Sequence, residues 1–235
     1  MIRQYHLPLP QHEAMTAEDF MVTDSNREAV VWLGDRAPSS WTTHCLTLHG
    51  PAGSGKTHLL TVWARKHEAV TLVPGADVLD DLVNQARTFH ALALDDADRI
   101  AGQAEHEEWL QHLYNATKSS GIPLLLTART APSGWGLGLK DIASRLKSCL
   151  AVELHEPDDD LMRGMLLKQF SDRQLLVETE VVEYLARRLE RTAAAIREAV
   201  TLLDQTALEQ GHKISVPFAQ KVLAQQLSFD TTTQP

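Results

Sequence analysis

The stretch Gly50-Pro51-Ala52-Gly53-Ser54-Gly55-Lys56-Thr57 is a complete phosphate-binding loop of the form G-x-x-x-x-G-K-[ST]. It follows an apolar–polar alternation over residues 45–49 and precedes apolar residues at helical spacing from Leu59 onward. Glycines let the backbone curl so that its N–H groups and the next helix N-terminus surround a phosphate. Lys56 then contacts the β- and γ-phosphates, and the Thr57 hydroxyl completes a Mg²⁺ shell. The loop and the adjacent His58 therefore predict a site for ATP or ADP with Mg²⁺.

The pattern around this loop predicts an α/β fold. Strand candidates alternate with helical patterns up to residue 154, which is typical of βαβ units and a mostly parallel sheet. The unbroken apolar run at 124–126 suits a strand that is buried on both faces. The expected strands are 45–49, 69–73, 91–94, 122–127 and 150–154.

After residue 156 the pattern is helical only, so a small all-helical domain follows the α/β domain. Before the loop, a helix is expected to begin near Ser25-Asn26, which are good capping residues, and to end at Pro38. The expected divisions are an N-terminal tail at 1–18, the nucleotide-binding domain at 19–156, the helical domain at 157–229 and a C-terminal tail at 230–235.

Composition excludes several classes of protein. The chain has 235 residues, 43% of them hydrophobic and 23% charged, as in globular domains that remain in water. A formal charge of −9 argues against nucleic acid as the main partner, because phosphate backbones require clustered Lys and Arg. The two cysteines have no metal-site spacing, and no signal peptide or membrane-spanning run is present. We therefore expect a cytoplasmic location, reduced thiols and no membrane partner.

Two adjacent acids follow the third expected strand, about forty residues after the loop lysine. In phosphate-loop ATPases the first acid at this place holds Mg²⁺, directly or through water, and the second orients and deprotonates the attacking water. We assign these roles to Asp95 and Asp96. The alternative is a pair of acids that only solvates the end of the strand.

Two arginines are candidates for contact with a nucleotide. Arg145 lies on a short helical segment between the fourth and fifth strands, where a guanidinium can reach the γ-phosphate of a neighbouring subunit. Arg197 lies near the start of a helix in the helical domain and can fold over bound nucleotide. For each, the alternative is a solvated or salt-bridged surface side chain. Arg187, Arg188 and Arg191 are further candidates for the role given to Arg197.

Loop, paired acids, arginine and helical lid, in this order, resemble the AAA+ ATPases. Within that class the chain is similar to the replication initiator DnaA and more closely to its shortened relatives, the Hda proteins. The resemblance extends from about residue 4 to 227. It rests on Glu18-Asp19-Phe20, Ser25-Asn26, the loop with His58-Leu59-Leu60, Ala143-Ser144-Arg145-Leu146 and Lys213-Ile214-Ser215-Val216-Pro217-Phe218.

The N-terminal tail reads Gln4-Tyr5-His6-Leu7-Pro8-Leu9. It resembles the Q-L-x-L-P-L peptide with which Hda proteins dock into the DNA polymerase sliding clamp, with Tyr5 in place of the usual leucine. A glutamine and leucines on an extended, proline-stiffened peptide suit such a groove. The alternative is a tail with incidental leucines.

The resemblance implies an AAA+ core with a helical lid, bound to the β clamp, that inserts Arg145 into the nucleotide site of ATP-loaded DnaA. DnaA-bound ATP is then hydrolysed and over-initiation prevented. It also implies a possible homo-oligomer through the AAA+ interface. Because the chain stops soon after its lid, we expect no sequence-specific DNA binding. Arg129 stands where DnaA-like proteins often carry an acid, which implies weak intrinsic ATPase activity. Two alternatives stay open, a helicase-loader-like ATPase and a nucleotide-dependent scaffold without catalytic role.

Overall fold

The computed structural model describes residues 21–75 and 89–230. Within these residues a five-stranded sheet has the order β2-β3-β4-β1-β5, and every neighbouring pair is parallel. The expected strands are all present, with ends that shift by one or two residues. They are β1 (Cys45–His49), β2 (Val70–Leu72), β3 (Leu92–Leu94), β4 (Leu124–Ala128) and β5 (Leu150–Glu153).

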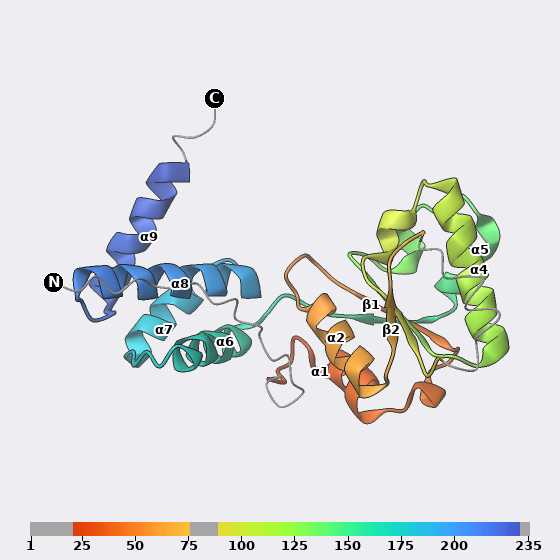
Figure 1. Cartoon of the computed structure of the whole chain (residues 1–235), viewed down its shortest axis with the longest axis horizontal. Helices are drawn as coiled ribbons and strands as arrows, with labels where there is room; N and C mark the ends of the chain where they lie inside the picture. The colour runs from red at the N-terminus through yellow and green to blue at the C-terminus, as the bar shows by residue number, and fades with distance from the viewer. Residues whose placement is uncertain (1–20, 76–88, 231–235) are drawn as a thin grey trace, which may run out of the picture.

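Helices cover both faces of the sheet (Figure 1). One face carries α1 (Arg27–Val30) and α2 (Lys56–Lys66), and the other carries α4 (Ala104–Ser120) and α5 (Lys140–Lys147). Because successive side chains of a strand point to opposite faces, β4 contributes to both layers. Leu124 and Leu126 belong to the core under α4 and α5, whereas Leu125 belongs to the core under α2.

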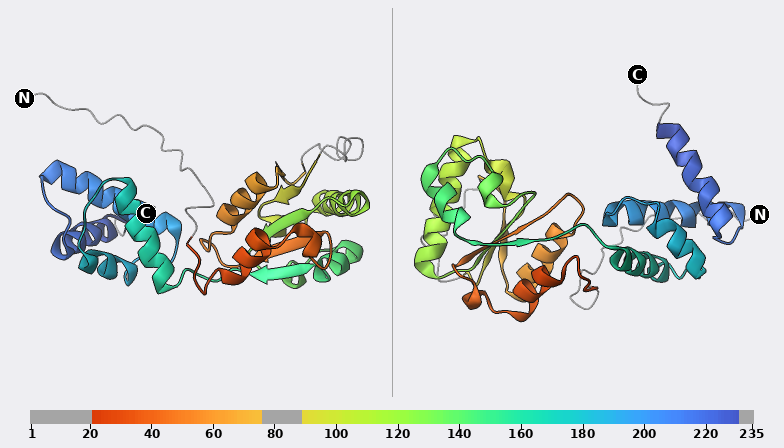
Figure 2. Two further views of the ribbon diagram at one scale, coloured as in Figure 1. Left: turned by 90° about the horizontal axis from the view of Figure 1, so that it is seen from below. Right: turned by 180° about the vertical axis from the view of Figure 1, so that it is seen from behind.

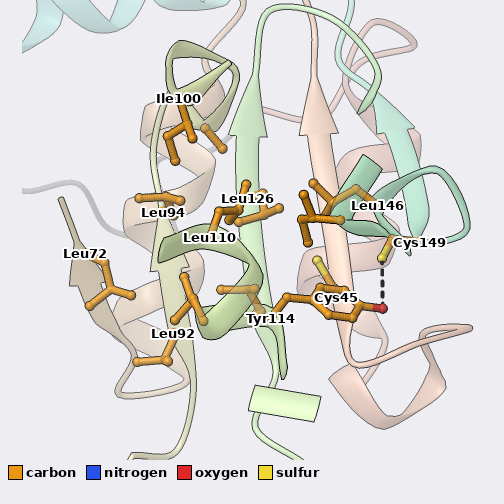
Figure 3. Packing of buried hydrophobic residues seen from close by; sticks show 14 of the residues in the cluster. Cys45, Leu72, Leu92, Leu94, Ile100, Leu110, Tyr114, Leu126, Leu146 and Cys149 are labelled. Atoms are coloured by element: carbon orange, nitrogen blue, oxygen red, sulfur yellow. Dashed lines mark hydrogen bonds between the residues drawn. The ribbon is translucent and has the colours of Figure 1, made fainter. Parts of the chain in front are cut away.

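The core under α4 and α5 contains both cysteines (Figure 3). Cys45 and Cys149 are free and buried. The Cys149 Sγ donates to the Tyr114 hydroxyl over 3.8 Å and to the Arg145 carbonyl over 3.3 Å. The end of α5 is thereby packed against α4.

The expected first helix is divided into two turns of different geometry. The α-helix α1 ends at Val30 and continues as a π-helical turn, η2 (Val31–Asp35). Short 3₁₀ turns complete the α/β domain at η3 (Pro38–Ser40), η4 (Ala97–Ile100) and η5 (Pro132–Gly134).

The lid consists of α6 (Asp159–Asp172), α7 (Thr179–Ala186), α8 (Ala193–Gln210) and α9 (Val216–Asp230). A separate apolar cluster holds it together and includes the buried residues Phe170, Leu185 and Leu203. Figure 2 shows that the lid follows β5 through a single extended connection. No helix within the described ranges is long and apolar enough to cross a membrane.

Candidate nucleotide-binding site

The phosphate loop joins the C-terminal end of β1 to the N-terminus of α2, and its glycines are required by its shape. Gly53 and Gly55 have φ angles of +78° and +100°, which L-residues rarely adopt. A Cβ placed on Gly50 would lie only 2.0 Å from the Leu154 carbonyl oxygen. The loop backbone can therefore approach β5 and turn into the helix only with glycine at these positions.

Lys56, the first residue of α2, is a buried lysine directed back into the loop. Its Nζ donates to the carbonyl oxygens of Gly50 at 2.8 Å and Pro51 at 2.7 Å. Burial lowers the pKa of Lys56 below its ordinary value, while the carboxylates of Asp96 and Asp95 oppose that shift. A phosphate beside this ammonium would likewise favour its charged form.

Thr57 and Asp95, the two residues that the sequence assigns to Mg²⁺, lie in contact at the end of the sheet. The Thr57 hydroxyl donates to Asp95 Oδ2 at 2.8 Å. The other carboxylate oxygen, Oδ1, accepts a hydrogen bond from the Thr127 hydroxyl. A hydroxyl and a carboxylate in contact are oxygen donors of the kind that Mg²⁺ takes beside a nucleotide.

The loop also fits a phosphate. Ser54 Oγ is buried and has no hydrogen-bond partner within the described part of the chain. Backbone N–H groups at the start of α2 add the partial positive charge of a helix N-terminus. Lys56, Thr57 and Asp95 would hold a nucleotide together with Mg²⁺. When bound, the metal ion and the nucleotide would supply a terminal phosphate whose P–O bonds are polarised.

Asp96 has an unusual backbone conformation. Its φ and ψ angles are 51° and 43°, in the left-handed region, and its N–H donates to Thr127 Oγ1 at 3.0 Å. Its carboxylate pairs with Arg99 at 3.5 Å. Asp96 directly follows Asp95, and its left-handed conformation begins the turn η4 after β3.

Thr127 is the site residue that the sequence reasoning missed. Fully buried at the end of β4, it contacts both Asp95 and the backbone of Asp96. The available signal was a polar residue that ends an apolar central strand beside the acid pair. Arg129, two residues later, is exposed, and its N–H donates to Asp98 Oδ2 at 2.9 Å.

Arg145 is not part of this cluster. It lies on α5, at the end of the core away from the lid helices (Figure 1). Its Nε donates to Asp141 at 2.8 Å and its Nη1 to Asn115 at 3.1 Å. A carboxylate and an amide thus orient the guanidinium of a side chain that is 36% exposed.

The lid touches the phosphate loop through the start of α8. A Cβ on Gly53 would lie 2.3 Å from Thr192 Cγ2, so the threonine methyl packs against the loop backbone. Arg197 lies on the same helix and is exposed. Arg197 therefore belongs to the helix whose first turn contacts the phosphate loop.

The alternative lid arginines have partners elsewhere. Arg191 donates to the Pro157 carbonyl at 2.9 Å and to Asp159 at 2.6 Å, which ties it to the connection between core and lid. Arg187 pairs with Glu183 at 3.6 Å, and Arg188 lies over the Tyr184 ring at 5.3 Å. The clamp-like residues 4–9 lie outside the described residues.

Comparisons with known proteins agree with this architecture. Residues 159–223 match the family model described as Hda, lid domain. An uncharacterized protein of Haemophilus influenzae is 29% identical over 95% of this chain and 99% of the relative. The chromosomal replication initiator protein DnaA of Thermomicrobium roseum is 26% identical over 92% of this chain and 51% of the relative. The chain thus spans about half the length of that DnaA relative.

Solved structures share the fold. Domain III of Thermotoga maritima DnaA superposes with a TM-score of 0.75 at 20% identity, covering 92% of this chain and 98% of that one. AMPPCP-bound DnaA from Aquifex aeolicus has a TM-score of 0.68 at 19% identity, covering 83% of this chain and 66% of that one.

The parallel sheet with its helices and the separate helical lid have the arrangement of an AAA+ core and lid. Together with the matched lid, these relatives show that the chain is a DnaA-related AAA+ protein with an Hda-type lid domain.

Proposed function

We propose that the chain binds ATP or ADP with Mg²⁺ at the phosphate loop. Lys56 binds the terminal phosphates, and Thr57 with Asp95 holds the metal. Support comes from the contact of Thr57 with Asp95 at 2.8 Å and from the buried ammonium facing the loop. The fold neighbour from Aquifex aeolicus, a DnaA, is itself bound to AMPPCP.

We further propose that the chain acts on a partner, DnaA, whose bound ATP it causes to be hydrolysed. The observation that carries this proposal is the state of Arg145, an oriented and partly exposed guanidinium away from its own loop. A planar, permanently charged guanidinium stabilises the charge that develops on a transferring phosphoryl group. Asp141 and Asn115 hold it in place for a phosphate supplied by a neighbouring subunit.

In this proposal the polymerase sliding clamp anchors the chain on DNA through Gln4-Tyr5-His6-Leu7-Pro8-Leu9. The nucleotide at the chain's own loop sets its shape, and Asp96 supports at most slow intrinsic hydrolysis. A homo-oligomer would use the same AAA+ surface that meets DnaA. The chain would then be a negative regulator of replication initiation.

The test is ATP hydrolysis by purified DnaA, measured with and without this chain and with and without DNA-loaded clamp. Stimulation is expected only with the complete set. Arg145→Ala should lose stimulation by on the order of 10³-fold, because that is the usual contribution of such an arginine. Arg145→Lys should fail nearly as badly, since an ammonium lacks the planar fork.

Lys147→Ala, on the same helix, is the matched control and should stimulate normally. If Arg145→Ala stimulates at the wild-type rate, the catalytic contact lies elsewhere. If the chain hydrolyses ATP rapidly without DnaA, an independent ATPase is the better description.

A further inference from the structure

Thr192 uses the two branches of its side chain for different contacts. Its Oγ1 accepts a hydrogen bond from the Ala195 N–H at 3.1 Å and thereby caps α8. Its methyl group packs against a different segment, the backbone of Gly53 in the phosphate loop. A Cβ on Gly53 would also lie 2.7 Å from Thr192 Cβ, so the two segments are in close contact.

The neighbouring residue fixes the same helix end to the connection between core and lid. Arg191 bridges the Pro157 carbonyl and the Asp159 carboxylate, at 2.9 Å and 2.6 Å. Asp159 is the first residue of α6. The start of α8 is therefore held on one side by the interdomain connection and on the other by the phosphate loop.

We propose that Thr192 is a positioning residue, whose methyl group couples the phosphate loop to the lid and so sets where α8 carries Arg197. This inference rests on the proposed nucleotide site. When the methyl contact is present, the lid lies against the loop before a ligand arrives. Without it, the lid samples other positions, and the apparent affinity falls by the fraction of time spent in them.

The branched side chain supplies its own matched pair of variants. Thr192→Ser keeps the capping hydroxyl and removes the methyl, whereas Thr192→Val keeps a methyl and removes the hydroxyl. A merely structural role as a helix cap would make Thr192→Val the more damaging change in every measurement. In the coupling role, Thr192→Ser should mainly weaken ADP binding, whereas Thr192→Val should mainly lower the thermal midpoint.

The experiment measures ADP binding by calorimetry, thermal unfolding, and hydrogen exchange in α8 on the full chain. Thr192→Ser should weaken ADP binding about fourfold, the effect of one lost methyl contact, with an unchanged thermal midpoint. Its α8 amides should exchange faster than in wild type. Thr192→Val should keep the ADP affinity and lower the midpoint by about 2–4 °C, as expected for a lost cap.

Combining Thr192→Ser with Arg197→Ala tests whether Thr192 affects ADP binding through Arg197. If Thr192 acts by placing Arg197, the double variant binds ADP no more weakly than Arg197→Ala alone. Additive losses would overturn the proposal, as would wild-type affinity and wild-type α8 exchange in Thr192→Ser.

Lys56→Ala separates this inference from the proposed function. A wild-type chain that binds ADP no better than Lys56→Ala overturns the nucleotide site, and the role of Thr192 at that site falls with it. Tight wild-type binding together with an unaffected Thr192→Ser variant overturns the coupling alone.

Discussion

At the scale of single residues, the site depends on polar side chains whose partners are distant in sequence. Thr127 lies 32 residues after Asp95, yet its hydroxyl contacts that carboxylate. The loop and the acids were predictable because each is a local pattern with a known chemistry. Thr127 was not, because its role arises only when parallel strands β3 and β4 end side by side.

Glu107 is a second residue with a role that its local sequence does not reveal. It is 2% exposed, and its carboxylate accepts hydrogen bonds from the N–H groups of Gly102 at 2.9 Å and Leu139 at 2.8 Å. Leu139 is the residue before α5. The buried carboxylate therefore fixes the entry to the helix that carries Arg145.

Glu107→Gln should lower the free energy of unfolding by about 1–3 kcal/mol at neutral pH, because its NH₂ group cannot accept from a backbone N–H. Burial alone would raise the pKa of Glu107. The N–H donors of Leu139 and Gly102 lower it by more than burial raises it, so the net shift of the pKa is downward. Its stabilisation is thus present above the ordinary glutamate pKa and is lost as pH falls through the folded-state pKa.

Urea unfolding of wild type and Glu107→Gln across the acid range measures this dependence. The difference in stability between the two proteins should shrink as the pH falls. A difference that stays constant through the acid range would contradict the assignment to an ionised carboxylate.

At the scale of elements, hydrophobic pattern was sufficient for the strands and for the division between sheet and helices. Every expected strand is present because each is a short apolar run between turn residues. The π-helical turn η2 was not predictable, since an apolar residue spacing suits both helix types over so short a segment. The predicted start of the first helix near Ser25-Asn26 agrees with α1, whose N-cap residue is Asn26.

Asp158 caps α6 and connects it to the first described segment of the core. Its Oδ1 accepts from the Leu161 N–H at 2.8 Å and its Oδ2 from the Ser25 N–H at 3.2 Å. Asp158→Ala should cost about 1–2 kcal/mol of stability through the lost cap. Asp158→Asn should have an intermediate effect, because its one carbonyl oxygen can still cap α6, whereas its NH₂ group cannot accept the hydrogen bond from the Ser25 N–H.

Chemical unfolding of both variants checks this expectation. An equal loss of stability in the asparagine and alanine variants would show that the capping oxygen does not stabilise the start of the lid, and that the second carboxylate oxygen or its charge does.

At the scale of the whole molecule, the sequence predicted a parallel α/β core followed by a helical lid, and this is confirmed by the sheet and by the matched lid. The contact between the lid and the phosphate loop was not predictable. Gly53 and Thr192 are 139 positions apart in the sequence, and nothing local to either indicates the other. Clamp binding and action on DnaA stay predictions, because they concern surfaces that meet other proteins.

Deletion of residues 1–10 should abolish binding to the sliding clamp and leave ADP affinity and the thermal midpoint unchanged. The reason is that an extended peptide with a glutamine and leucines suits a clamp groove. The midpoint should stay unchanged because a short proline-rich segment supplies few apolar side chains to a core.

Surface plasmon resonance on immobilised clamp measures the first effect, and calorimetry and thermal unfolding measure the others. The full-length variant with Gln4→Ala, Leu7→Ala and Leu9→Ala should behave like the deletion. Clamp binding of the deletion at wild-type strength would assign docking to another part of the chain.

The central place of β1 also constrains how the chain is made. Within the described sheet β1 pairs with β4 and β5, and both of these strands belong to the second half of the protein, which a ribosome makes later. At the usual rate of about 5–20 residues per second, the phosphate loop waits on the order of 5–20 s for β5 to be translated. During that interval we expect nucleotide to add little to folding, because the loop has not yet met the strand end that its glycines approach.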